Sequence, residues 1–182
     1  MRVKKYLPSL LTMGNLFLGF LSILYIQRAS NPSTNTSFFE ISCYLILCAT
    51  ILDSLDGKLA RKIGLASDFG KEIDSLADLI SFCLAPAFLI FNIYLHDWTL
   101  LNQQPFFSET FFLYLAFISS LPVIMGAIRL ARFNVTHSQE GNKAYFIGLP
   151  SPMLAITICS IVMMKINLEH QLDKFFELNI IL

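Results

Sequence analysis

Five long apolar stretches restrict the fold of this chain more than any other feature of its sequence. A helix needs about 20 predominantly apolar residues to cross a membrane, and each stretch approaches or exceeds that length. Hydrophobic residues make up 55% of the 182 residues and charged residues 14%, which is too apolar for a soluble domain of this size. We therefore predict an all-α polytopic membrane bundle, with spans at residues 10–26, 38–62, 69–95, 111–130 and 149–164.

Two short segments flank these spans. The N-terminal segment MRVKKYLPSLL is basic, but no small-residue cleavage site follows it, so we expect a retained interfacial segment and not a signal peptide. The C-terminal segment FFELNIIL is too short to make a sixth span. Because no repeat or low-complexity tract interrupts the chain, we expect residues 1–182 to form a single membrane domain.

Lysine and arginine residues are unevenly distributed between the segments that connect the predicted spans. Ten of the 13 fall on the side that holds the N-terminus and the connection between the second and third spans. Because basic residues collect on the cytoplasmic side of a membrane, we expect this side to face the cytoplasm. The formal net charge is +0, which gives no indication of a nucleic-acid partner.

Four aspartates interrupt the second and third apolar stretches, at Asp53, Asp56, Asp74 and Asp78. Spacings of three and four residues place each pair on one face of its own helix. Gly64 in the short connection allows the chain to reverse, so that the two helices run antiparallel. At about 1.5 Å of rise per residue, all four carboxylates are expected at a similar depth, roughly 13–20 Å from the turn.

Carboxylates gathered in an apolar layer need a cation to remain ionised, because burial and like-charge repulsion both favour the protonated acid. The segment from Asp53 to Asp78 contains no histidine or cysteine, so oxygen is the ligand type that it offers. Oxygen ligands favour hard divalent cations. We therefore predict that the four aspartates bind Mg²⁺ or Mn²⁺, as a pair of ions.

Small residues and one arginine accompany the aspartates. Gly57 and Ala60 follow Asp56 on the second span, and Gly70 precedes the third aspartate by one helical turn. Small side chains leave room for a bulky ligand against the backbone, and the guanidinium of Arg61 is suited to phosphate. Each glycine taken singly is more simply explained by close helix packing. Together with four acids inside a membrane, however, these residues predict a metal-dependent diphosphate site.

Two features of the spans are interpreted as structural. Asn15 and Gly19 lie one turn apart on the same face of the first span, which is typical of a helix-packing notch with one hydrogen-bonding side chain. Pro86 lies in the third span beyond the aspartates, where it is expected to kink the helix. Neither feature requires a ligand.

The segment from Asp53 to Asp78 reads D-x-x-D-G-x-x-A-R and, after eight further residues, G-x-x-x-D-x-x-x-D. This pattern resembles the signature of the CDP-alcohol phosphatidyltransferase family, with every fixed position filled. Four further segments are similar to the CDP-diacylglycerol–serine O-phosphatidyltransferase branch of that family: TMGNLFLGF, SFCLAPA, RLARFNV and GLPSP. Cys83 stands where that branch usually has glycine, which is expected to alter the packing near the site. The family usually has six or more spans, so a C-terminal helix is expected to be missing from this chain.

The resemblance implies an enzyme that transfers a phosphatidyl group from CDP-diacylglycerol to L-serine and releases CMP. It implies that the four aspartates bind two metal ions, that Gly57, Ala60 and Arg61 receive the CDP moiety, and that Asp78 is the general base. A homodimer in a prokaryotic cytoplasmic membrane is implied in the same way. This agrees with the residues themselves, because metal ions would neutralise the diphosphate and favour in-line attack by an alcohol.

The acceptor alcohol depends on the fourth span, which ends in RLARFNV. Arg129 and Arg132 lie on one helical face at its cytoplasmic end, with Asn134 just beyond. The positive-inside distribution explains both arginines simply, but planar guanidinium groups also bind carboxylates or phosphates. We therefore predict these three residues as the serine-binding set. Glycerol 3-phosphate or an inositol compound stays open as the acceptor. A divalent-cation transporter is the alternative from another functional class, although transport gives no reason for the small residues and the arginine beside the aspartates.

Overall fold

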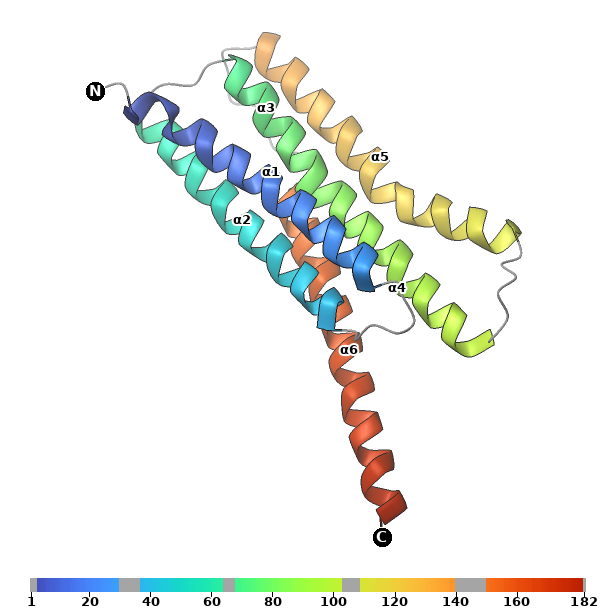
Figure 1. Cartoon of the computed structure of the whole chain (residues 1–182). Helices are drawn as coiled ribbons and strands as arrows, with labels where there is room; N and C mark the ends of the chain where they lie inside the picture. Colours follow the sequence, from blue (N-terminus) through green and yellow to red (C-terminus); the bar gives the residue numbers. More distant parts are fainter. Residues whose placement is uncertain (1–2, 30–36, 64–67, 103–108, 140–149, 182) are drawn as a thin grey trace.

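The computed structural model describes residues 3–29, 37–63, 68–102, 109–139 and 150–181, and within them the chain is almost entirely helical (Figure 1). The helices are packed side by side as a bundle. In chain order they are α1 (Val3–Ala29), α2 (Ser37–Ile63), α3 (Asp68–Asp78), the π-helix η1 (Leu79–Leu84), α4 (Ala85–Asn102), α5 (Glu109–Gln139) and α6 (Ser151–Ile181). The turn predicted at Gly64 lies outside the described residues.

Five stretches of these helices are long and apolar enough to cross a membrane. The spans are Ser9–Ala29, Ser37–Leu59, Phe69–Asp97, Glu109–Phe133 and Ser151–Leu172. They confirm the predicted all-α architecture with five spans, and they indicate an integral membrane protein. Helices satisfy every backbone hydrogen bond within one segment, which is what the interior of a bilayer demands. Large apolar side chains such as Phe17, Phe117 and Met164 are accordingly exposed on the outside of the bundle.

The last helix is longer than the apolar pattern predicts. The fifth apolar stretch was expected to end at residue 164, whereas α6 continues to Ile181 and its lower part projects beyond the other helices (Figure 1). Residues 175–181 of the segment FFELNIIL therefore belong to α6. Polar residues such as those of KINLEHQLDK end an apolar span, but this sequence contains no glycine or proline and is made mostly of helix formers, so the helix itself continues.

The third span lies at the centre of the bundle and is built from three consecutive elements, α3, η1 and α4. Its most apolar window is 56% buried, against 17–33% for the other spans. Three successive residues of η1, Ser81, Phe82 and Cys83, are completely buried. Pro86 is the second residue after η1 and has no backbone N–H to bond to the carbonyl of Phe82. The wider π-helical turns accommodate this interruption, which the sequence predicts as a kink.

Two glycines allow neighbouring helices to approach η1 closely. A Cβ added to Gly19 of α1 would lie 2.8 Å from Ser81 Cα, so the packing notch predicted in the first span is confirmed. A Cβ added to Gly126 of α5 would lie 3.1 Å from Cys83 Cβ and would also press on the thiol. Cys83 therefore packs into the space left by a glycine on the facing helix, so that η1 and α5 can approach closely although Cys83 has a side chain.

Candidate active site

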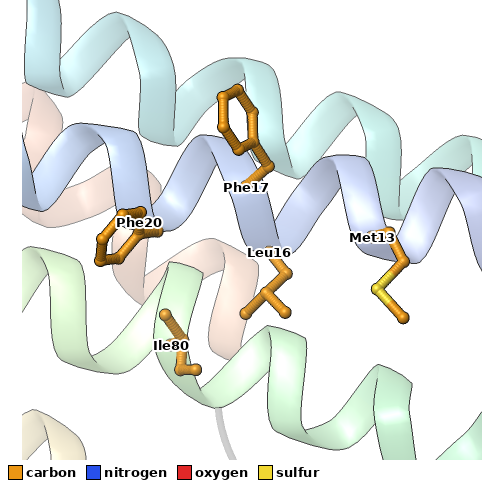
Figure 2. A pocket seen from close by; sticks show the side chains of 5 residues that line it. All are labelled: Met13, Leu16, Phe17, Phe20 and Ile80. Atoms are coloured by element: carbon orange, nitrogen blue, oxygen red, sulfur yellow. The ribbon is translucent and has the colours of Figure 1, made fainter.

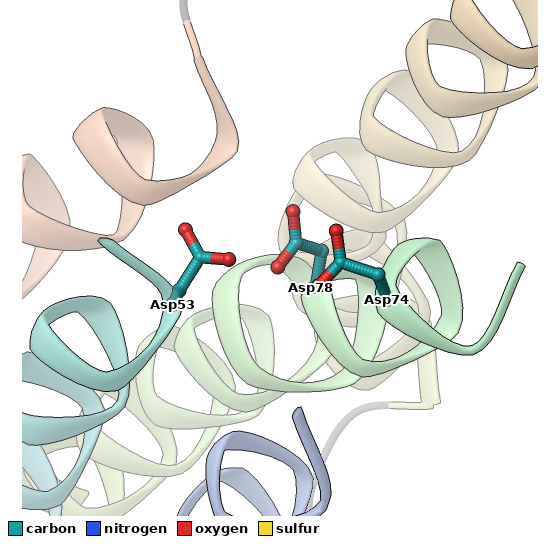
Figure 3. Close-up of side chains that lie close together, drawn as sticks. All are labelled: Asp53, Asp74 and Asp78. Atoms are coloured by element: carbon teal, nitrogen blue, oxygen red, sulfur yellow. The ribbon is translucent and has the colours of Figure 1, made fainter. Parts of the chain in front are cut away.

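Three of the four predicted carboxylates meet at one place in the bundle. Asp53 projects from α2, and Asp74 and Asp78 project from successive turns of α3 toward it (Figure 3). One carboxylate oxygen from each residue lies within 4.8 Å of the others, and all three side chains are partly buried. We call these residues the carboxylate trio. Their donor set consists of oxygen atoms within one ion's reach, which fits a hard divalent cation and no softer metal.

Asp56 does not belong to the trio. It is 5% exposed and accepts a hydrogen bond from the hydroxyl of Thr12 on α1. An offset of three residues from Asp53 rotates a side chain by about 60° around the helix and displaces it by about 4.5 Å along the axis. This rotation directs the Asp56 carboxylate toward α1. Three of the four aspartates therefore meet as expected. A metal-binding role for Asp56 stays a prediction.

The first span reaches the trio through a second polar side chain. Asn15 Nδ2 donates a hydrogen bond of 3.5 Å to Asp78 Oδ1, and Ser81 Oγ donates one of 3.0 Å to the backbone carbonyl of Asn15. Sequence reasoning treated Asn15 as a packing residue and did not consider Thr12. The signal that was available is that the polar residues of an apolar span, Thr12 and Asn15, lie on the same helical face as Gly19.

The two arginines predicted to bind the acceptor differ in the structure. Arg129 is half-buried, and its Nη2 donates a hydrogen bond of 2.6 Å to Ser151 Oγ at the start of α6. It is also close enough to Asp78 to interact with that carboxylate electrostatically. Arg132 is exposed, one turn nearer the end of α5. Asn134 belongs to α5, but its side chain lies outside the described residues.

The small residues beside the trio leave space. A Cβ added to Gly57 would meet no described atom within 4 Å, which separates this glycine from the packed positions Gly19 and Gly126. Gly70 is half-buried on α3. The side chains of Ala60 and Arg61, at the end of α2, lie outside the described part of the chain. The described atoms therefore do not support close helix packing as the explanation for Gly57. They are consistent with space for a ligand beside this glycine.

An apolar groove of about 360 Å³ lies elsewhere on the surface of α1 (Figure 2). It is lined by Met13, Leu16, Phe17 and Phe20 of α1 and by Ile80 of η1. None of these side chains is ionisable, and the only heteroatom among them is the weakly polar Met13 thioether sulfur. The groove suits contact with lipid chains, and the chemistry belongs to the carboxylate trio.

Comparison with known proteins identifies the family. The profile of the CDP-alcohol phosphatidyltransferases matches residues 5–180. This chain belongs to the CDP-alcohol phosphatidyltransferase family. The family is known to use divalent metal ions, which agrees with the oxygen donors of the carboxylate trio.

Several curated relatives carry the name of one activity. The chain is 33% identical over 172 residues to the CDP-diacylglycerol–serine O-phosphatidyltransferase of Helicobacter pylori, covering 93% of this chain and 63% of the relative. It is 39% identical over 156 residues to the archaetidylserine synthase of Methanothermobacter thermautotrophicus, covering 85% and 56%. It is 37% identical over 153 residues to the Saccharomyces cerevisiae CDP-diacylglycerol–serine O-phosphatidyltransferase, covering 81% and 50%. The chain thus spans about half to two thirds of the length of these relatives.

Proposed function

We propose that this protein transfers a phosphatidyl group from CDP-diacylglycerol to L-serine, giving phosphatidylserine and CMP, with Mg²⁺ or Mn²⁺ as the cofactor. The observation that carries the proposal is the position of Arg129 beside the carboxylate trio, because it joins a cationic side chain suited to a carboxylate with a cluster suited to a metal-bound diphosphate. Serine is the acceptor named for the relatives from Helicobacter pylori and Saccharomyces cerevisiae.

The carboxylate trio would hold the metal, with Asp56 as the fourth ligand of the signature. Two bound ions would supply charge neutralisation for the diphosphate and for the departing CMP. Gly57 leaves the backbone of α2 accessible, so that the nucleotide end of the substrate has room next to Asp56. Ala60 and Arg61 follow on the same helix and are assigned to CDP by the family signature.

Proton transfer is assigned to Asp78. The serine hydroxyl oxygen attacks the phosphorus that bears the diacylglycerol, the bond from that phosphorus to CMP breaks, and the hydroxyl proton passes to the Asp78 carboxylate. Asp78 suits this role because α1 and α5 both contribute polar groups around it, Asn15 by a hydrogen bond and Arg129 electrostatically. A base must lie within hydrogen-bond reach of the proton that it removes, and a base held by neighbouring groups keeps that geometry.

Recognition of serine is assigned to Arg129. A planar guanidinium can bind both oxygens of the amino-acid carboxylate, and the hydrogen bond to Ser151 holds the Arg129 side chain across from α6. Inositol carries no anionic group, so a cation at this position favours serine over inositol, whereas the phosphate of glycerol 3-phosphate could bind the same guanidinium and is distinguished by the acceptor panel. Arg132 and Asn134 remain predicted members of the serine-binding set.

The site is proposed to open toward the cytoplasm of a prokaryotic cell. The ends of α2 and α5 and the starts of α1 and α3 lie at the same end of the bundle, which is the end that carries most of the basic residues (Figure 1). Both CMP and serine are polar and water-soluble, whereas the acyl chains must stay in lipid. An active site at the cytoplasmic end of apolar helices meets both requirements. A homodimer and a single-domain organisation are proposed from the family alone.

The proposal is tested by an acceptor panel. The purified protein is supplied with CDP-diacylglycerol, Mg²⁺ or Mn²⁺, and L-serine, glycerol 3-phosphate or inositol in turn, and both CMP and the lipid product are measured. We expect metal-dependent CMP release with serine and phosphatidylserine as the product. Phosphatidylglycerol phosphate or an inositol lipid as the main product would replace serine with another acceptor. No CMP release with any acceptor would favour the transporter alternative.

A further inference from the structure

The first span presents one polar face to the carboxylates. Thr12 and Asn15 are 5% and 0% exposed, and Gly19 lies one turn further along the same face. We call Thr12 and Asn15 the α1 clamp. Its two side chains reach both helices of the carboxylate hairpin, since Thr12 contacts Asp56 of α2 and Asn15 contacts Asp78 of α3.

The height of the clamp along α1 is set by η1. The Ser81 hydroxyl donates to the carbonyl of Asn15 at 3.0 Å, and Gly19 leaves no room for a side chain against Ser81. These two contacts fix the axial position and the rotation of α1 against the third span. The donors of Thr12 and Asn15 are thereby held opposite their carboxylates.

Packing alone does not account for Asn15. Its side-chain oxygen Oδ1 is buried without a hydrogen-bond donor among the described residues. Leaving a buried amide oxygen unpaired is unfavourable, so an apolar side chain of similar size would suit a purely structural position better. The side chain does make one polar contact, through Nδ2 to Asp78, and that contact lies in the carboxylate trio.

We propose that Thr12 and Asn15 are positioning residues for the metal site, which act by holding Asp56 and Asp78 in the orientation that binds the cation. A carboxylate that accepts a hydrogen bond on one oxygen presents the other oxygen in a defined direction, and such outer contacts support metal affinity. The metal site then depends on three helices and not on the α2–α3 hairpin alone. This inference rests on the proposed metal-dependent function.

The first test is Mn²⁺ affinity, measured by electron paramagnetic resonance on the full chain in detergent without substrate. Thr12→Val keeps the shape of the side chain and removes its donor, and we expect it to weaken Mn²⁺ binding by about 10-fold or more. Thr12→Ser restores a hydroxyl and should bind nearly as well as the wild type. The matched control is Thr50→Val, because Thr50 is also buried in a span but donates its hydrogen bond to the carbonyl of Leu47 and not to a carboxylate.

A double-mutant cycle tests whether Thr12 acts through Asp56. In an Asp56→Asn background, Thr12→Val should cause little further loss of Mn²⁺ affinity, because the carboxylate that it orients is already absent. A full, additive loss would show that Thr12 acts by another route and would overturn its assignment. The measurement does not depend on turnover, so weak activity of these variants does not affect it.

Asn15→Leu separates a structural role from a positioning role. Because the variant removes an unpaired buried oxygen, its thermal stability without metal should equal or exceed that of the wild type, while Mn²⁺ binding weakens by about 10-fold. Unchanged affinity in both Thr12→Val and Asn15→Leu would overturn the α1 clamp and leave the proposed function intact. Absence of Mn²⁺ binding by the wild-type protein would overturn the proposed function and this inference together.

Discussion

Charged side chains are arranged in opposite ways at the two ends of the bundle. At the end away from the α2–α3 connection, Lys165 of α6 lies 2.5 Å from the Asp97 carboxylate of α4 and 3.2 Å from that of Glu169. One ammonium group there is paired with two carboxylates and ties α6 to α4. Each of these two carboxylates therefore has a cationic partner within the chain.

At the other end, the three aspartates of the carboxylate trio converge on one another, and Arg129 interacts electrostatically with one of them, Asp78. The difference shows how the same residue types serve two purposes in one membrane bundle. A paired charge connects helices, whereas converging like charges are tolerated only where a cation is to be bound. Four sets of substitutions test this contrast, from the largest expected effect to the smallest.

Removing a metal-binding carboxylate should have the largest effect. Asp53→Asn, Asp56→Asn and Asp74→Asn are each expected to abolish CMP release, because a neutral amide weakens metal binding and leaves the diphosphate charge unbalanced. The matched control is Asp97→Asn at the opposite end, which should retain turnover. A chelator should abolish activity reversibly, and wild-type turnover that persists in excess chelator would contradict the metal site.

Asp78→Asn should separate binding from proton transfer. If Asp78 is the base, the variant loses phosphatidyl transfer by about 10²–10⁴-fold while it still binds CDP-diacylglycerol. Single-turnover kinetics together with a nucleotide-binding measurement distinguish the two effects. A loss of only a few-fold would reduce Asp78 to a metal ligand without a role in proton transfer.

The two arginines of α5 should respond differently to the same substitution. Arg129→Lys replaces a planar fork with a point charge and is expected to raise the KM for serine by about 10-fold, equivalent to about 1.4 kcal/mol. Arg132→Lys should raise the KM for serine less, by under about 3-fold, because Arg132 is exposed and a guanidinium in contact with water contributes less to binding. Kinetics at saturating CDP-diacylglycerol with serine varied provide the measurement. Equal KM values in both variants would remove the serine assignment from Arg129.

Breaking the ion pair at the opposite end should have the smallest effect on function. Lys165→Met removes the cation that contacts Asp97 and Glu169, in side chains that are about one third to one half exposed. We expect the free energy of unfolding to fall by about 1 kcal/mol, seen as a lower melting temperature, with turnover per folded molecule unchanged. A large loss of turnover at wild-type stability would show that this end also takes part in catalysis.

Sequence reasoning succeeded where the relevant property is local to one helix. Apolar length located all five spans, and a spacing of four residues placed Asp74 and Asp78 on one face of α3. It did not anticipate that the Asp56 carboxylate accepts a hydrogen bond from a hydroxyl 44 residues away on α1. It also treated Arg129 and Arg132 alike, because equal charge and helical spacing do not reveal which side chain faces the bundle.

The sequence by itself determined the number of spans, their helical form and the oxygen ligands of the site, since hydropathy and helical periodicity act within one segment of chain. The tertiary structure decided which polar groups meet. Thr12 reaches Asp56, Asn15 reaches Asp78 and Arg129 reaches Ser151 because the helices are held at particular rotations and depths by contacts such as that of Gly19 with Ser81. Those rotations result from the packing of several helices against one another, and no single helix specifies them.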